Sequence, residues 1–252
     1  MFKLISANLY RLRRSKTFYI LGGLIFLIGI YSYINTNGFE PLACVDCPNQ
    51  LGSVIFMHNY VGFLFLPIFL GFFFNAFYRH GTVKNQIITG HSRPNIYLAN
   101  LLTSILVNII FSLFYLSGVL LIYLILGGTG IASTWQDVIW FFFLSFLVIL
   151  FISSVYTFVT MTFASTLGSS LVNFITIVWQ MRSIDLVSID YRSTYGLYKY
   201  FYDFILNITP MGEVYKISSL EDSLHTLPIV SIILSIFLTT YGIILFRKKQ
   251  IN

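Results

Sequence analysis

YRHGTVKNQIITGHSRPNIY, residues 78–97, is a polar stretch that separates the second and third of the chain's long apolar blocks. It contains three basic residues and no acid. Gly81 and Gly90 bracket eight residues, enough for about two helical turns. Ser92 suits the N-cap of a new helix, and Pro94 suits its first turn, where a missing N–H costs little. The stretch therefore predicts a short helix stopped by both glycines, followed at once by a long helix.

The apolar composition excludes a soluble globular protein. Of the 252 residues, 57% are apolar and 10% are charged, and the mean hydropathy is +0.81. Soluble domains carry about a quarter charged residues. Several blocks of about 20 residues carry no charge, which is the length that crosses a membrane as a helix. We therefore expect an all-α membrane protein, with residues 1–252 forming one transmembrane domain.

Six membrane spans are predicted, which puts both termini on the same side. The spans are residues 17–33, 53–78, 95–126, 138–162, 163–182 and 228–246. Residues 79–94 form the loop between the second and third spans, and residues 183–227 form a long polar segment before the last. The fifth span is the weakest, because Gln180, Arg182 and Asp185 follow only about ten apolar-rich positions.

The basic residues decide the predicted orientation. A cytoplasmic N-terminus places 11 of the 15 Lys and Arg residues inside and all nine acids outside. The inner residues are Lys3, Arg11, Arg13, Arg14, Lys16, Arg79, Lys84, Arg93, Arg247, Lys248 and Lys249. Basic residues in short loops favour the cytoplasmic side. We predict a multi-pass protein of the plasma membrane with both termini and residues 79–94 in the cytoplasm.

Residues 1–16 predict an amphipathic helix at the membrane surface. Its apolar face comprises Phe2, Ile5, Leu9 and Leu12. Another face comprises Lys3, Ala7, Arg11 and Arg14, whose cations would point toward anionic lipid. The alternative, the basic start of a signal peptide, fits less well. The apolar block that follows is too long, and no small-residue cleavage site closes it.

Familiar catalytic and metal-binding motifs are absent from the sequence. No GxxxxGK[ST], HExxH, GxSxG or GxGxxG motif occurs, so we assign no catalytic residue. Cys44 and Cys47 form a CVDC pair in the first outer loop. They could form a strained disulfide or stay free thiols, whereas two thiols alone make a poor metal site. We expect no metal, no cofactor in this chain, and no nucleic-acid partner, because the cations sit at span ends rather than on one basic face.

The spans contain few polar residues and no acids. The candidates for lining a transport pathway are His58, Asn59, Asn173 and Gln180, with Asn108 a weaker one. Such residues also form hydrogen bonds between membrane helices, each worth about 0.6–2 kcal/mol. Both interpretations are open at this point. The aromatic patch at residues 195–206 could likewise face a substrate or lie on the membrane surface.

The layout of the whole chain resembles the permease subunit of a type-two ABC exporter. The sharpest match in residues is Gly81-Thr82-Val83-Lys84-Asn85, with Gly90, Ser92-Arg93 and Ile96-Tyr97. The resemblance implies a coupling helix that contacts a separate ATPase subunit through Gly81, Thr82, Val83, Lys84, Asn85, Gln86, Ile87, Ile88, Thr89 and Gly90. The N-terminal amphipathic helix would be the connecting helix that packs beside it.

The resemblance also implies partners. They are two copies of the ATPase, which would bind ATP and Mg, a second permease as a homodimer or heterodimer, and membrane lipid. A pathway would lie between the permease halves and involve the first, second and fifth spans. Members of the family often carry an acid shortly before the Gly-Thr pair, whereas Asn75, Arg79 and His80 occupy that region here. A salt bridge to that acid is therefore not carried over.

The implied function is ATP-driven export of an amphiphilic substrate. We favour an antimicrobial or cytolytic peptide, because an aromatic second span and an interior of low charge suit such a cargo better than a small ion. Export of lipid, drug or sodium is an alternative. Alternatives from other classes are a membrane sensor or immunity protein that does not transport, and a membrane-embedded enzyme with an outward-facing site built from the outer acids.

Overall fold

The computed structural model describes residues 1–37, 58–79, 81–126, 135–163, 172–173, 175–178 and 227–248. All regular structure in these segments is α-helical. The helices are α1 (Phe2–Arg14), α2 (Lys16–Asn37), α4 (His58–Arg79), α5 (Thr82–Ile88), α6 (Arg93–Ile125), α7 (Trp135–Thr162) and α11 (Leu227–Lys248). The prediction of an all-α chain is thus confirmed for the part that is described.

Four helices are long and apolar enough to cross a membrane. Their spanning stretches are Lys16–Asn35, Arg93–Ile125, Phe142–Thr162 and Ile229–Lys248. α4 adds a shorter apolar stretch, His58–Phe74. A chain with this many apolar helices of bilayer length has the character of a multi-pass membrane protein.

The predicted spans coincide with observed helices wherever the two can be compared. α2, α6, α7 and α11 each match a predicted span to within four residues at both ends, and α4 covers the described part of the second span. Of the predicted fifth span, residues 172–173 and 175–178 are described and helical. Gln180, Cys44, Cys47 and nearly all of segment 183–227 lie outside the described residues.

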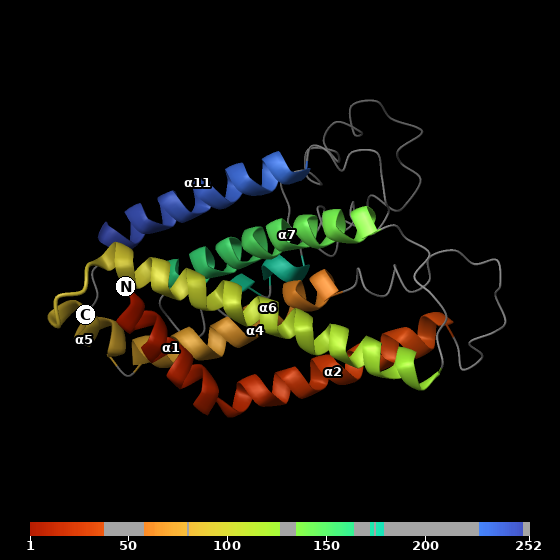
Figure 1. The fold of residues 1–252 in the computed structure, drawn as a ribbon. Coiled ribbons are helices and arrows are strands. Elements are labelled where there is room, and N and C mark those ends of the chain that lie inside the picture. The colour runs from red at the N-terminus through yellow and green to blue at the C-terminus, as the bar shows by residue number, and fades with distance from the viewer. Residues whose placement is uncertain are drawn as a thin grey trace.

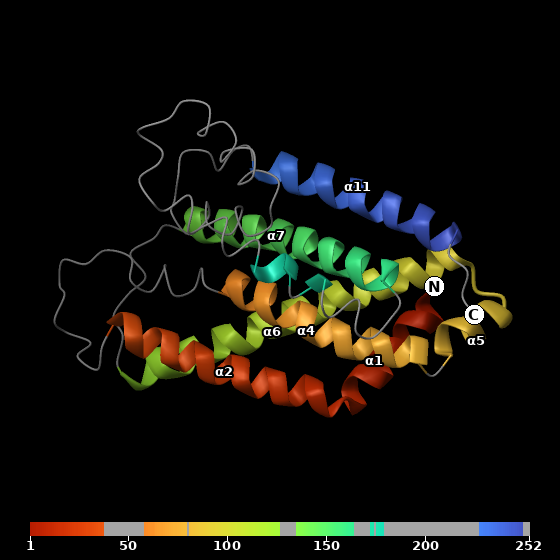
Figure 2. The same ribbon diagram turned by 180° about the vertical axis from the view of Figure 1, so that it is seen from behind.

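The helices form an elongated bundle whose two ends differ. The N-terminus, α5 and the C-terminal end of α11 lie at the same end (Figures 1 and 2). α7 and α11 pack side by side and run in the same direction, so that α7 ends and α11 begins at opposite ends of the bundle. Between them in sequence, Asn173 donates through Nδ2 to the backbone carbonyl of Pro67 in α4, at 3.3 Å.

α2 and α6 pack closely because two glycines remove the side chains between them. A Cβ on Gly29 would overlap the backbone carbonyl of Tyr115, and a Cβ on Gly118 would overlap that of Phe26. Small residues allow membrane helices to approach to backbone contact, where dispersion forces are strongest. The reciprocal pair fixes α2 against α6 in the second half of each helix.

α1 packs against the bundle mainly through residues other than the apolar ones predicted to lie in the membrane surface. Its buried residues are Leu4, Asn8 and Leu12, whereas Phe2 is 88% exposed and Leu9 is also exposed. Leu12 alone among the four predicted apolar residues is buried. The Asn8 side-chain N–H group donates to two partners on α6, which together with burial of Leu4 and Leu12 favours this rotation of α1.

The break between α1 and α2 lies at Ser15. Its backbone is extended (φ −77°, ψ 112°), so the helix cannot continue through it. The Ser15 hydroxyl accepts a hydrogen bond from the Phe18 backbone N–H at 3.4 Å, as an N-cap residue does. The Tyr19 hydroxyl donates back to the Arg13 carbonyl at 3.0 Å. These contacts fix α1 at an angle to α2 (Figure 1).

Candidate functional site

α5 is a two-turn helix that glycine stops at both ends, as the sequence predicts. Gly81 is its N-cap, with φ 62°, and the Gly81 carbonyl accepts the Asn85 N–H at 2.9 Å. At the other end Gly90 has φ 86°. The Gly90 N–H donates to the Ile87 carbonyl at 3.0 Å, and the His91 N–H donates to the Gln86 carbonyl at 3.1 Å. This pair of bonds is the Schellman motif, in which a left-handed glycine ends a helix.

The chain restarts as α6 with no slack after α5. Ser92 occupies the N-cap position in an extended conformation and Pro94 lies in the first turn, both as predicted. The Arg93 guanidinium reaches across to the C-terminal end of α11. Its Nη1 donates to the carbonyls of Arg247 at 2.6 Å and Phe246 at 3.5 Å. A cation at the last carbonyls of a helix is stabilising, so this contact joins the loop after α5 to α11.

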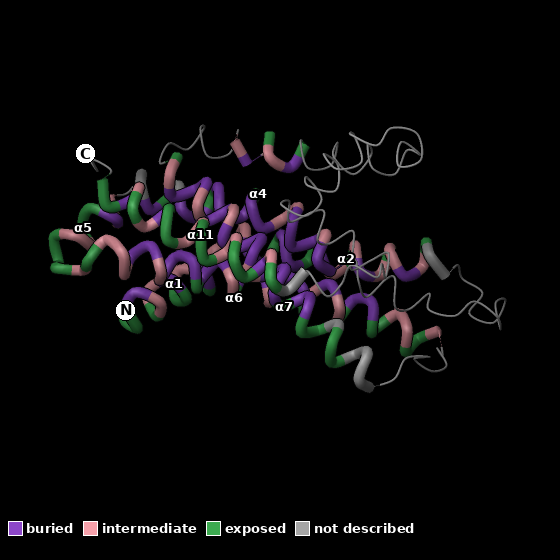
Figure 3. The backbone as a smooth tube through the Cα atoms, turned by 90° about the horizontal axis from the view of Figure 1, so that it is seen from above, coloured by how far each residue is buried: buried purple, intermediate pink, exposed green. Residues whose placement is uncertain are grey.

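α5 has one face held by its own chain and one face turned outward. Val83 is 1% exposed and belongs to the hydrophobic core, and Ile87 packs partly against it. Ile88 is 73% exposed, and Lys84 and Asn85 are exposed beside it. The helix lies at one extremity of the bundle (Figure 3). Of the ten residues predicted to contact a partner, five are exposed and so placed to do so without rearrangement: Lys84, Asn85, Ile88, Thr89 and Gly90.

The end of the bundle around α5 is uniformly cationic in the described segments. Asp137, at the start of α7, is the one acid that these segments contain, and it lies at the opposite end. The basic residues at the α5 end are Lys3, Arg11, Arg13, Arg14, Lys16, Arg79, Lys84, Arg93, Arg247 and Lys248. Such an excess of positive charge favours anionic partners at this end, whether phosphates, carboxylates or lipid headgroups.

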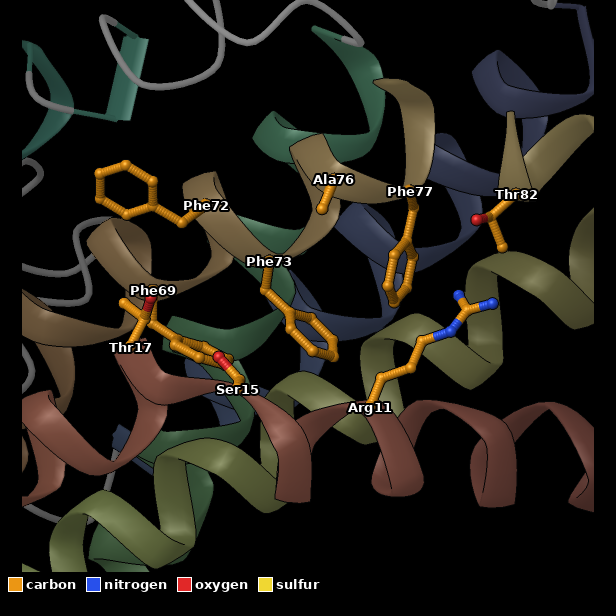
Figure 4. Close-up of a pocket in the computed structure, with 9 residues that line it drawn as sticks. All are labelled: Arg11, Ser15, Thr17, Phe69, Phe72, Phe73, Ala76, Phe77 and Thr82. Carbon is orange, nitrogen blue, oxygen red and sulfur yellow. The ribbon is translucent and has the colours of Figure 1, made fainter. Parts of the chain in front are cut away.

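A pocket of about 400 Å³ opens where α1, α2 and α4 meet the start of α5 (Figure 4). Its lining is Arg11, Ser15, Thr17, Phe69, Phe72, Phe73, Ala76, Phe77 and Thr82. The guanidinium carbon of Arg11 lies 4.8 Å from the centroid of the Phe77 ring, a cation–π contact. The sequence places Arg11 toward lipid on the α1 surface and gives no sign of this pocket, because it arises only where α1 folds against α4.

The four described residues among those predicted for a transport pathway are buried, and the three asparagines donate hydrogen bonds to neighbouring segments. His58, Asn59, Asn108 and Asn173 are all 2% exposed or less. The Asn59 amide donates to Ser145 Oγ on α7 at 3.2 Å. Hydrogen bonds between helices use the side-chain N–H groups of Asn59 and Asn173, whereas their buried Oδ1 atoms have no partner. None of the four residues lines the pocket beside α5. A role in transport stays a prediction for them.

A polar seam between α6 and α7 was not predicted. Three contacts follow an antiparallel register in steps of four residues: Asn108 with Ser153 at 3.5 Å, Ser104 with Thr157 at 2.8 Å, and Asn100 with Met161 at 3.4 Å. The next step pairs Ser112 with the apolar Ile149, and the Ser112 hydroxyl has no partner. Part of the signal was present in the sequence, since polar residues recur every four positions on α6 at Asn100, Ser104, Asn108 and Ser112, whereas only Ser153 and Thr157 continue the pattern on α7.

The seam continues onto α1 through Asn8. Its Nδ2 donates to Asn100 Oδ1 at 2.9 Å and to Thr103 Oγ1 at 3.1 Å. α1, α6 and α7 are therefore joined by one run of buried polar contacts, which starts at the end of the bundle that carries α5. Among the described residues, no group of three His, Cys, Asp or Glu side chains comes together as a metal site would require.

Comparisons with known proteins add no assignment. No family model matches the chain, and no curated protein matches it.

Proposed function

We propose that the chain is the transmembrane subunit of an ATP-driven exporter of the type-two ABC class, with α5 as the coupling helix that meets a separate ATPase. The observation that carries the proposal is α5 itself. It has a fixed length, a glycine stop at each end, a buried anchor at Val83 and an outward face at Lys84, Asn85 and Ile88. A rigid element of this kind, joined directly to two long helices, suits the transfer of a motion from a partner.

The proposed topology has six spans with both termini in the cytoplasm. Three observations support it: the N-terminus and the end of α11 share one end of the bundle, the cations of the described segments gather there, and α7 and α11 run in the same direction. Because α7 and α11 run in the same direction, the chain between them must cross the membrane once more, and residues 163–182 are the candidate for that crossing. Basic residues at one end favour a cytoplasmic location for that end.

The proposed cargo is amphiphilic, with an antimicrobial or cytolytic peptide as the favoured class. The support is the aromatic sequence of α4 and the near absence of acids from the described helices. ATP and Mg would bind to two copies of the ATPase. A second permease copy, identical or related, would complete the translocation pathway.

The test places a photo-crosslinking amino acid at residue 88 of the full chain in its native membrane. Ile88 lies outward on α5, and residue 229, which is 61% exposed at the start of α11, provides a matched site at the other end of the bundle. We expect residue 88 to capture a protein that mass spectrometry identifies as an ATPase with a phosphate-binding loop, encoded next to this chain. Residue 229 should not capture it.

A variant pair completes this test. Ile88→Asp should weaken co-purification of the captured ATPase at least tenfold, because it places a charge within an apolar contact. Thr240→Asp, at an exposed position on α11, is the control and should leave co-purification unchanged. An ATPase that associates equally with wild type and Ile88→Asp, or a residue-88 product without any ATPase, would refute the proposed role of α5.

A further inference from the structure

We propose that the pocket between α1, α2, α4 and α5 binds an anionic phospholipid, with its phosphate on Arg11 and an acyl chain along the phenylalanine wall. Four observations lead to this occupant: a shielded cation, the lack of an acid near it, an aromatic lining and a position at the membrane boundary. The inference does not depend on the exporter assignment, since it concerns the chain alone in a bilayer.

The first observation is a cation with an unfilled hydrogen-bonding position. Arg11 Nη1 is shielded from solvent and has no hydrogen-bond partner. The Phe77 ring beside the guanidinium attracts its charge but accepts no strong hydrogen bond. Shielding an ionised donor without an acceptor is costly. An oxygen anion in the pocket would remove that cost, and a phosphate suits the flat guanidinium fork.

The second observation is that no described residue supplies the missing anion. α1, α2, α4, α5 and α6 contain no Asp or Glu in their described segments. The remaining polar groups in the lining are the hydroxyls of Ser15, Thr17 and Thr82, which can donate to a phosphate but cannot neutralise Arg11. Figure 4 shows the guanidinium directed toward Thr82, so that both groups lie at the same end of the pocket.

The third observation is that the rest of the lining is apolar. Phe69, Phe72, Phe73, Ala76 and Phe77 line one side of the pocket, and Phe72 is 64% exposed at its edge. A pocket of about 400 Å³ far exceeds the size of a free phosphate and would leave the phenylalanine rings in contact with water. An amphiphile places its charge on Arg11 and its chain on the rings, so it matches both parts of the lining.

The fourth observation is depth. The apolar stretch of α2 begins at Lys16 and that of α4 ends at Phe74. Arg11 and Thr82 lie just beyond these limits, whereas Phe69 and Phe73 lie within them. The charged end of the pocket is therefore at headgroup level and its aromatic end at acyl-chain level. Arg13, Arg14 and Lys16 nearby raise the local concentration of anionic lipid.

The test uses fluorescence quenching by brominated lipids in vesicles that contain the full chain without an ATPase. A Phe72→Trp reporter lies at the pocket edge, and quenching of the parent chain, which has three tryptophans, is subtracted. An Ile244→Trp reporter is the control, since Ile244 is an exposed residue at the same end of the bundle and outside the pocket. We expect brominated phosphatidylglycerol to be preferred over brominated phosphatidylcholine about fivefold at Phe72→Trp. At Ile244→Trp the preference should be weaker than twofold.

Two variant pairs assign the preference to Arg11. Arg11→Gln should reduce it to near unity, whereas Arg14→Gln should retain it, because Arg14 instead lies over the Tyr10 ring at 4.6 Å and outside the pocket. If Arg11→Gln does not fold, Thr82→Asp decides the question by supplying an internal anion. It should abolish the preference, while the uncharged Thr82→Asn should keep it.

Three results would overturn the proposal. They are equal quenching by the two lipids at Phe72→Trp, a preference that survives in both Arg11→Gln and Thr82→Asp, and loss of the preference on adding millimolar inorganic phosphate. The last result would assign the pocket to a soluble anion instead of a lipid.

Discussion

Replacing Gly90 by alanine tests whether the Schellman motif holds α5 in place. Gly90 has φ 86°, in the left-handed region that a residue with a Cβ rarely adopts. A Cβ at this position meets no atom within 4 Å, so the substitution adds no steric clash. Its cost is therefore only the conformational free energy of holding a residue with a Cβ in the left-handed region, about 1–2 kcal/mol.

The assay is hydrogen exchange of the peptide that covers residues 82–91, with the chain in a bilayer mimic. The amides of Thr89, Gly90 and His91 each donate to a carbonyl of α5, so their exchange reports the opening of its C-terminal turn. A destabilisation of about 1–2 kcal/mol corresponds to about 5- to 30-fold faster exchange in Gly90→Ala. Gly90→Asn should exchange more slowly than Gly90→Ala, because asparagine tolerates the left-handed region.

Gly23→Ala is the matched control for this experiment. A Cβ added at Gly23 would also meet open space. Gly23 lies within α2, however, and its φ is not positive. Alanine there should leave exchange of α5 unchanged and slightly favour the helix. Unchanged exchange in Gly90→Ala, or an equal increase in Gly23→Ala, would refute the assignment of the helix stop to the glycine conformation.

Two further predictions concern helix packing and are checked by unfolding in mixed micelles followed by circular dichroism. Gly29→Val should lower the free energy of unfolding by about 1–3 kcal/mol, because its side chain overlaps the α6 backbone. Gly23→Val, in open space on the same helix, should cost less than 1 kcal/mol, and equal losses would contradict this account of α2–α6 packing. Ser104→Ala should cost about 0.6–1.7 kcal/mol, because the buried Thr157 hydroxyl loses its acceptor. Ser112→Ala should be neutral or slightly stabilising, since its hydroxyl has no partner, and a larger loss in Ser112→Ala than in Ser104→Ala would refute the register of the polar seam.

Sequence reasoning succeeded where one local rule decides the outcome. Apolar run length placed α2, α6, α7 and α11, because a spanning helix must satisfy its own backbone over about 20 residues. The ends of α5 followed from Gly81 and Gly90, since left-handed backbone conformations select glycine. In both cases the controlling interaction lies within a few residues of sequence.

Sequence reasoning did not identify which face of a helix packs against the protein. Lipid tails and a protein interior are both apolar, so hydrophobic periodicity alone does not distinguish them. On α1 the decisive residue is therefore the polar Asn8, which is 1% exposed, and not Phe2, which is 88% exposed. The pocket at Arg11 was missed for the same reason, because it depends on the rotation of α1 that Asn8 sets.

The contacts around α5 determine where a displacement of this helix would be felt. Its N-terminal end follows α4, whose Phe77 holds Arg11 of α1. Its C-terminal end leads into α6 through Arg93, which is bonded to the last turn of α11. From α6 the seam of Asn8, Asn100 and Ser104 continues to α1 and α7. Packed interiors transmit strain instead of absorbing it. A partner that moves α5 would therefore act on α4 and α1 through its N-terminal end and on α6 and α11 through its C-terminal end. A lipid on Arg11 would alter the first of these connections and leave the second unchanged.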